Sequence, residues 1–265
     1  MRPKRSLGQN FLVDPVHQRR IVDALDPRPD DEILEVGPGR GALTEHLVGR
    51  VRRLILVELD DDLAAELTRR WGGRDDVRIV HEDILEVDPA DHAEDAAALR
   101  IVGNIPYNIT TPILFHLLRR PRPAEILLMV QREVAERIVA EPGTGAYGAL
   151  AVGVQSVADV ARVLDVPRGA FRPVPRVDSS VVRVLPHDPP RLEPGEEERL
   201  RHLVRAAFQW RRKQFQKTLR DHPDLGLERS AVEELEARTG YDLRRRPETF
   251  PPAAFIRLSG LLSAT

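Results

Sequence analysis

The spacing of apolar and polar positions along the first part of the chain distinguishes strands from helices. Mostly apolar stretches of buried-strand length occur at 33–36, 54–57, 77–80, 99–102 and 125–130. Segments with helical apolar spacing lie between most of them, over about 15–25, 42–48, 60–71 and 111–117. Buried strands that alternate with helices predict a parallel sheet covered on both faces. We therefore expect a doubly wound α/β fold.

The pattern changes in the second half of the chain. Residues 132–140 and 146–157 look helical, and 160–164 and 180–185 predict a closing strand pair that adds an antiparallel strand to the sheet. Beyond the prolines at 186–190 only helical patterns remain, at 196–208, 211–220, 228–238 and 251–262. We predict one α/β domain over residues 1–190, with 1–13 as an extended arm, and a small all-α domain over 191–265.

Composition restricts the class of protein. The chain of 265 residues is 42% hydrophobic and 31% charged, as in ordinary soluble proteins. No run approaches the ~18 apolar residues of a membrane helix, and Ser6–Asn10 is too polar for a signal peptide. The absence of cysteine excludes disulfides, thiolate metal sites and a cysteine nucleophile. We expect a cytoplasmic protein without a membrane partner or a bound metal.

Charge is distributed unevenly. The net charge of −2 does not by itself suggest a nucleic-acid partner. However, acidic residues dominate 58–98, and all three lysines lie in basic clusters. Chance and a nucleic-acid surface explain the lysines equally well. The basic clusters are at 2–5, 168–183, 199–220 and 244–246.

A glycine-rich loop follows the first predicted strand. The stretch Glu35–Gly41 reads Glu-Val-Gly-Pro-Gly-Arg-Gly between a strand and a helical pattern. Glycines let a backbone approach a ligand closely, as in nucleotide-binding α/β folds. Gly37-x-Gly39-x-x-Ala42 also fits the relaxed dinucleotide fingerprint, so the loop alone does not choose a cofactor.

Polar residues end the next three strands. Glu58 lies 21 positions after Gly37 and could accept both hydroxyls of a ribose, which suits NAD and S-adenosylmethionine equally. Asp83 could accept from an adenine amine, although a capping or turn carboxylate explains it as well. Asn104 ends the fourth strand. Ligands of such sheets bind beyond the carboxyl ends of the strands, so we expect these residues to converge.

The segment Asn104-Ile105-Pro106-Tyr107 favours one chemistry. It places an amide oxygen, a backbone carbonyl and an aromatic ring at one strand end. These groups can hold a planar base and accept hydrogen bonds from its exocyclic amine. A sulfonium methyl donor is already activated, so positioning can supply most of the catalysis. A dehydrogenase has no use for this arrangement, and the segment therefore favours S-adenosylmethionine over NAD.

Several ordered motifs resemble those of the ribosomal RNA adenine N6,N6-dimethyltransferases, a family that includes erythromycin-resistance enzymes. The resemblance runs from residue 6 to about 220 and implies a Rossmann-like class I methyltransferase fold. The matching segments are Ser6–Leu12, Glu35–Thr44, Val57-Glu58, Glu82–Ile84, Asn104–Pro112, Phe171–Ser179 (F-x-P-x-P-x-V-D-S) and Ala207–Lys213 (A-F-x-x-R-R-K).

The resemblance also implies roles for individual residues. Asn10 and the Leu12 backbone would cover the methionine part of the cofactor, Gly37 and Gly39 would pass beneath it, and Glu58 and Asp83 would hold its ribose and adenine. Asn104 would contact both cofactor and target amine, Pro106 would supply a carbonyl, and Tyr107 and Phe171 would stack on the target base. Phe171 also fits a packed loop anchor. Phosphate contacts would come from Arg211, Arg212 and Lys213.

The implied reaction is dimethylation of two adjacent adenines in a hairpin near the 3′ end of small-subunit (16S) rRNA during ribosome biogenesis. The substrate would be an immature 30S subunit and the enzyme a monomer. Residues 214–217 separate Arg-Arg-Lys from Thr-Leu-Arg, which are contiguous in the family pattern. This departure concerns RNA docking and leaves the pocket untouched. A resistance-type enzyme that methylates large-subunit rRNA and a non-enzymatic assembly factor remain alternatives.

Overall fold

The structure, a computed structural model, describes residues 9–262 and separates into two compact units. The first unit contains the chain up to Ala135 together with Val160–Pro186. The second contains Glu136–Asp159 and the chain from His187 onward. Most of the predicted arm, residues 1–8, lies outside the described residues.

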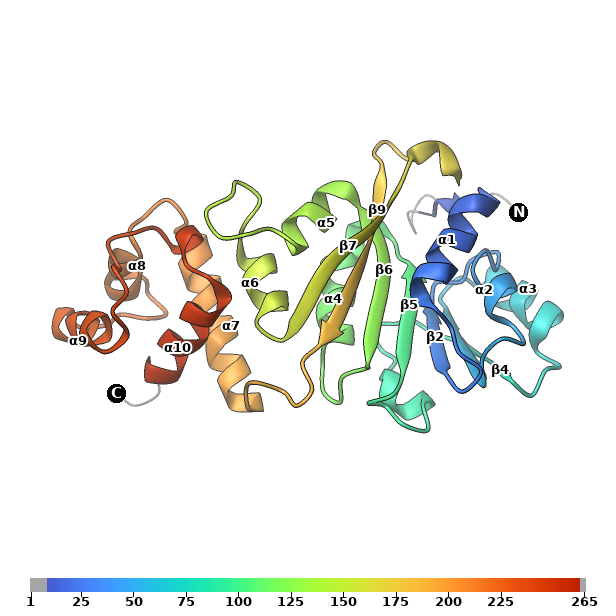
Figure 1. Cartoon of the computed structure of the whole chain (residues 1–265), viewed down its shortest axis with the longest axis horizontal. Coiled ribbons are helices and arrows are strands. Elements are labelled where there is room, and N and C mark those ends of the chain that lie inside the picture. The colour runs from blue at the N-terminus through green and yellow to red at the C-terminus, as the bar shows by residue number, and fades with distance from the viewer. Residues whose placement is uncertain (1–8, 263–265) are drawn as a thin grey trace. The chain divides into compact units, whose positions relative to one another are not determined.

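A mostly parallel sheet forms the centre of the first unit, as predicted (Figure 1). Within the described residues it has seven strands in the order β4-β3-β2-β5-β6-β9-β7. β4, β3, β2, β5 and β6 run parallel, and β9 is antiparallel to β6. The strands are β2 (Glu32–Val36), β3 (Arg53–Glu58), β4 (Val77–His81), β5 (Arg100–Asn104), β6 (Glu125–Gln131), β7 (Ala158–Val166) and β9 (Ser179–Pro186).

Helices cover both faces of this sheet, with α1 in front of it and α4 behind it in Figure 1. Every residue of β2 is buried, and its apolar residues therefore do not alternate with exposed polar ones, although two buried carboxyls, Glu32 and Glu35, belong to the strand. Asp14 caps α1, since its Oδ1 accepts from the backbone N–H groups of Val16 and His17. The helices are α1 (Pro15–Leu25), α2 (Thr44–Leu47), α3 (Asp61–Trp71) and α4 (Thr110–Leu117).

Two local predictions need correction. The helix expected over 42–48 is only the short α2, because Gly41 has a positive φ of 83° and the following residues form turns. The segment 167–178, which links the two closing strands and in which we expected no strand, contains a short one, β8 (Phe171–Arg172), which pairs antiparallel with β1 (Phe11–Leu12). This pairing ties the end of the N-terminal arm to the link.

The second unit is helical and has its own apolar core. Its helices are α6 (Ala149–Gln155), α7 (Pro194–Gln209), α8 (Phe215–Asp221), α9 (Arg229–Thr239) and α10 (Pro252–Leu262), while α5 (Arg132–Ile138) contains the division between the units. Residues 136–159, which we predicted within the α/β domain, group with these helices. Tyr147, Ala151 and Val152 contribute buried side chains to their core. No helix in the described part of the chain is long and apolar enough to cross a membrane.

Candidate active site

The carboxyl ends of four parallel strands meet at one edge of the first unit's sheet. Val36 of β2 is in register with Val57 of β3 and Gly103 of β5, and Glu58 is in register with His81 of β4. A cavity of about 510 Å³ opens at this edge. Nine residues proposed from the sequence line it: Asn10, Leu12, Gly37, Gly39, Glu58, Asp83, Asn104, Pro106 and Tyr107.

The segment Gln9–Val13, here called the strap, forms one wall of the cavity. Asn104 Nδ2 donates to the Asn10 carbonyl at 3.1 Å, and Gln18 Nε2 donates to the Leu12 carbonyl at 3.0 Å. Gln9 Nε2 donates to Asp60 Oδ2 at 3.0 Å. The strap is therefore fixed by side chains from α1 and from two strand ends. Gln18 was missed at the sequence level because its partner is a backbone carbonyl, which no motif records.

The glycine loop contacts the strap through its backbone. Gly37 and Gly39 have φ angles of 63° and 58°, in the left-handed region that favours glycine. A Cβ at Gly39 would lie 3.3 Å from the Phe11 ring, and the Arg40 guanidinium lies 4.6 Å from the centroid of that ring. Only a glycine backbone fits so close to the strap without displacing Phe11.

Glu58 is buried at the floor of the cavity, with 6% of its surface exposed. Its Oε2 accepts from Gly39 N at 2.9 Å and its Oε1 accepts from Asp60 N at 2.9 Å. Burial raises the pKa of this carboxyl, and the backbone hydrogen bonds oppose the rise. Each carboxylate oxygen has two lone pairs, so each keeps one for a ligand. Two acceptors on one carboxylate suit a pair of neighbouring hydroxyls.

Glu35 is a second buried carboxyl of the cavity lining, and we had assigned it no role from the sequence. Its Oε2 accepts from Thr44 Oγ1 at 2.7 Å. Burial, with a further contribution from the charge of Glu58, raises the pKa of Glu35 to about 7. The side chain is thus close to its titration point at neutral pH.

Charge at the cavity distinguishes between cofactor classes. Among the described side chains that line the cavity, carboxylates outnumber the guanidinium of Arg40; they include Glu35, Glu45, Glu58, Glu82 and Asp83. Such a lining repels the pyrophosphate of a dinucleotide and attracts a cationic ligand. The loop also lacks a long helix directly behind it that could bind phosphate, since α2 begins only at Thr44. The cavity therefore fits a cationic nucleoside better than NAD.

The segment from Asn104 to Tyr107 brings polar groups and a ring to the cavity. Tyr107 OH and Ser179 Oγ are 2.5 Å apart, and burial raises the pKa of Tyr107, so its hydroxyl stays neutral. The Pro106 carbonyl accepts from Ile109 N and Thr110 Oγ1, both at 3.3 Å. These two bonds occupy both lone pairs of the carbonyl. Thr110 Oγ1 also lies 3.4 Å from the Tyr107 carbonyl, and it must turn to that oxygen for the Pro106 carbonyl to accept from a ligand.

Asp83 has the turn role that the sequence offered for it. Its Oδ1 accepts from Leu85 N at 3.0 Å, as a turn carboxylate does, and the residue also lines the cavity. The turn fixes the position of the carboxylate at the end of β4. Asp83 is therefore placed to accept a hydrogen bond from a ligand.

Phe171 does not lie where the resemblance implied. It is completely buried in the core beside Ala170 and Val181, and it does not line the cavity. β8 pairs it with Leu12 of the strap. As the structure stands, Phe171 is the packed loop anchor rather than a ring available for stacking on a base.

The three basic residues proposed for RNA binding belong to the second unit and differ from one another. Arg211 Nε contacts Glu248 Oε2 at 2.5 Å, and Arg211 Nη2 donates to the Gly145 carbonyl at 3.0 Å. Arg212 and Lys213 are exposed. The helix predicted over 211–220 begins only at Phe215, so these residues lie in the turn between α7 and α8.

Comparisons with known proteins point to one family. A model of the family described as "Ribosomal RNA adenine dimethylase" matches residues 1–232. A Geobacter metallireducens protein named "Ribosomal RNA small subunit methyltransferase A" is 44% identical, with 100% of this chain and 97% of that protein covered. A protein of the same name from Moorella thermoacetica is 42% identical, with 98% and 92% covered.

Solved structures show the same fold. A dimethyladenosine transferase from Plasmodium falciparum superposes with a TM-score of 0.78 at 24% identity, covering 94% of this chain and 95% of that one. The 23S rRNA methyltransferase ErmE superposes with a TM-score of 0.72 at 31% identity, covering 96% and 100%. The predicted Rossmann-like methyltransferase fold and enzyme class are confirmed. The chain belongs to the ribosomal RNA adenine dimethylase family.

Proposed function

We propose that the chain transfers methyl groups from S-adenosylmethionine to the N6 amines of two adjacent adenines in a hairpin near the 3′ end of small-subunit (16S) rRNA. The observation that carries this proposal is the position of Asn104, Pro106 and Tyr107 on the same acid-lined cavity as Glu58. One part of the cavity suits a cationic nucleoside and the other suits an adenine amine.

The residues present fit S-adenosylmethionine. Glu58 has a lone pair left on each oxygen for the ribose hydroxyls, and Asp83 can accept from the cofactor's adenine amine. Asn10 and the backbone of Leu12 cover the methionine part, with Gly37 and Gly39 passing beneath. When bound, the cofactor supplies an electrophilic methyl group on its sulfonium.

The protein's part in the reaction is to hold the target amine. The amide oxygen of Asn104 and the carbonyl of Pro106 accept its N–H groups, which favours the tetrahedral nitrogen geometry that attack requires. The ring of Tyr107 stacks on the base, while its bond to Ser179 fixes the plane of the ring. Stacking offsets part of the cost of removing the base from its helix or loop.

Small-subunit rRNA is the proposed substrate because the relatives at 41–44% identity are named for that subunit. The segment Ala207–Lys213 also matches the pattern of that branch. We further propose that the enzyme acts as a monomer in the cytoplasm on immature 30S subunits, with Arg212 and Lys213 contacting phosphates. These contacts would orient the RNA without reading its sequence.

The likeness to the 23S rRNA methyltransferase ErmE makes a large-subunit substrate the second candidate. The test is transfer of labelled methyl groups to small subunits purified from a strain without the dimethyltransferase, beside protein-free 23S rRNA. Label on the small subunit and little on 23S rRNA is the expected result. The reverse preference would establish the second candidate.

A non-enzymatic assembly factor is separated from both by an Asn104→Ala variant. We expect that variant to bind the subunit and to lose methyl transfer. Absence of methyl transfer by the wild-type chain, together with an unchanged cell phenotype of Asn104→Ala, would instead support the assembly factor.

A further inference from the structure

The turn between α7 and α8 has a fixed conformation and carries an aromatic residue. Lys213 N donates to the Trp210 carbonyl at 2.8 Å, which closes the turn. Arg211 holds it to Glu248 and Gly145 by the contacts described above. Trp210 is only partly buried, whereas the chain's other tryptophan, Trp71, is 9% exposed and packs in the first unit. The second unit thus presents one partly exposed indole.

The indole of Trp210 rests against a buried histidine. The rings of Trp210 and His222 have centroids 5.1 Å apart with an interplanar angle of 60°. His222 is held in turn by Gln209 Oε1 at 2.8 Å and by the N–H of Asp224 at 3.2 Å from its Nδ1. A large ring supported by a fixed neighbour loses little conformational freedom on binding a ligand, which favours a binding platform.

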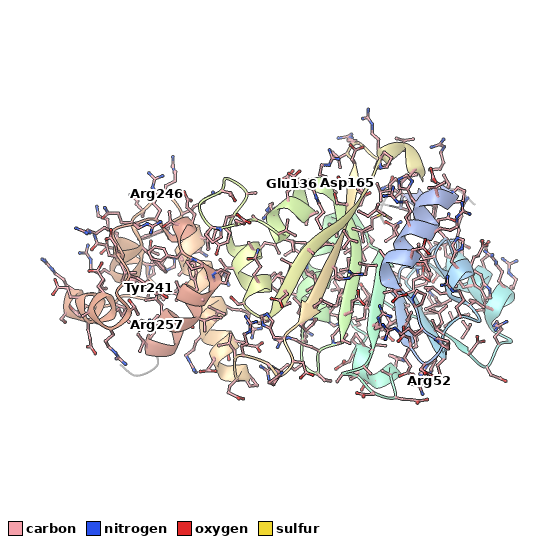
Figure 2. All side chains as sticks on the ribbon, viewed as in Figure 1. Arg52, Glu136, Asp165, Tyr241, Arg246 and Arg257 are labelled. Atoms are coloured by element: carbon pink, nitrogen blue, oxygen red, sulfur yellow. The ribbon has the colours of Figure 1, made fainter. Side chains whose placement is uncertain are left out.

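A second basic segment is joined to this turn. Phe215 N donates to the Arg245 carbonyl at 2.9 Å, and Gln216 N donates to the Leu243 carbonyl at 2.8 Å. These bonds bring Arg244–Arg246 beside the start of α8, although the two segments are about 30 residues apart in the chain. Arg246 is exposed and projects from the second unit in Figure 2. It lies beyond the residues that match the family model.

The basic residues of the two segments differ in whether they form an ion pair among the described residues. Arg211 is paired with Glu248, and Arg244 Nε contacts Asp242 Oδ1 at 2.7 Å. Arg212, Lys213 and Arg246 are exposed, and no ion pair is found for them among the described residues. A partly exposed indole flanked by unpaired cations is the arrangement that binds single-stranded nucleic acid: bases stack on the ring, and the cations contact phosphates.

We propose that Trp210, Arg212, Lys213 and Arg246 form a platform that binds an unpaired nucleotide and its flanking phosphates. This inference rests on the proposed function, because the RNA would be the ribosomal substrate. It extends the expected basic contact in two ways. Arg211 becomes an internal anchor, and a base contact to Trp210 is added.

Tryptophan emission tests the platform directly. In a Trp71→Phe variant all tryptophan emission comes from Trp210. Titration with a short single-stranded oligoadenylate should quench that emission in a saturable way, and the quenching should weaken as salt is raised. Unchanged emission when a labelled strand is shown by anisotropy to be bound would overturn the proposal.

Substitutions separate stacking from charge. Trp210→Ala should weaken binding of the labelled strand roughly 5- to 150-fold, and Trp210→Phe should recover part of the loss. Arg212→Ala and Arg246→Ala should each lower the slope of log K against log salt by about 0.7. Arg257→Ala is the matched control. Arg257 is an exposed arginine of α10 that lies near Tyr241 in Figure 2 and donates to the Arg238 carbonyl. Wild-type binding by Trp210→Ala would refute the platform.

Methyl transfer measured on the same proteins distinguishes this proposal from the function on which it rests. Quenching without methylation of small subunits would leave the platform standing and reject the proposed activity. Methylation without quenching would reject the platform and leave the proposed activity standing. Trp210→Ala should bind S-adenosylmethionine as tightly as wild type, because Trp210 belongs to the unit that does not form the cavity.

Discussion

Replacing Glu58 with glutamine should weaken cofactor binding by an amount that the hydrogen bonds around the carboxylate allow us to estimate. The two oxygens of Glu58 together offer about four acceptor sites. Gly39 N and Asp60 N occupy one site on each oxygen, which leaves two sites for the ribose hydroxyls. Glutamine keeps one carbonyl oxygen, and its amide group faces one of these N–H donors.

Glu58→Gln therefore loses the negative charge and at least one acceptor of a ribose hydroxyl. A hydrogen bond to a charged group contributes about 1.5–3 kcal/mol. At about 1.4 kcal/mol for each tenfold change, Kd should rise roughly 10- to 150-fold. Isothermal titration calorimetry with S-adenosylhomocysteine measures this change. Glu86→Gln is the matched control, because Glu86 is exposed and does not line the cavity.

A modified ligand makes the test specific for the ribose contact. The 2′-deoxy analogue of S-adenosylhomocysteine lacks one of the two ribose hydroxyls, so wild type already loses one hydrogen bond to Glu58 with this ligand. Glu58→Gln should therefore raise Kd for the analogue by a clearly smaller factor than it raises Kd for the parent ligand. An equal cost for both ligands would show that Glu58 acts through the fold of the loop rather than through the ribose. A Kd within threefold of wild type for the parent ligand would refute the assignment altogether.

Three further predictions concern the cavity and its support. Tyr107→Ala should lower kcat/KM for small subunits roughly 10- to 100-fold through lost stacking, whereas Tyr107→Phe keeps the ring and should lose less than about tenfold; equal losses would contradict stacking. Without cofactor, the raised pKa of Glu35 makes the folded state retain a proton that the unfolded state releases. The free energy of unfolding should therefore fall as pH rises from 4.5 to about 7, by at most about 3 kcal/mol. Urea unfolding of Glu35→Gln should lack that fall, and an unchanged pH profile would reject the assignment. Gly103→Ala would place a Cβ 2.7 Å from the Val36 carbonyl oxygen and should lower the free energy of unfolding in urea by about 1–3 kcal/mol. Gly73→Ala, with open space around it, should lower it little. Equal urea midpoints for the two variants would contradict the close pairing of β2 with β5.

Local patterns predicted most of the first unit correctly. Buried parallel strands are dominated by apolar residues, so β2, β3, β5 and β6 were found with errors of one or two residues at their ends. The convergence of Glu58, Asp83 and Asn104 also followed, because parallel strands that share a direction end at the same edge. These features depend only on neighbouring residues and on the general topology of such sheets.

Contacts between distant segments explain what the sequence did not predict. β1 and β8 have two residues each, too few for a periodic pattern, and their pairing buries Phe171. Arg211 belongs to a basic motif, but its partner Glu248 lies 37 residues later in the chain. Residues 136–159 join the helical unit because Tyr147 packs in its core and donates to the Phe250 carbonyl at 2.9 Å. None of these partners can be chosen from local spacing.

Mapping the methylated bases tests the central claim most directly. Small subunits from a strain without the dimethyltransferase are incubated with the enzyme and S-adenosylmethionine, and their rRNA is digested and sequenced by mass spectrometry. We predict two adjacent N6,N6-dimethyladenosines in a hairpin near the 3′ end with the wild-type chain and unmodified adenines with Asn104→Ala. A single modified adenine elsewhere, or no N6-methylation by the wild-type chain, would contradict it.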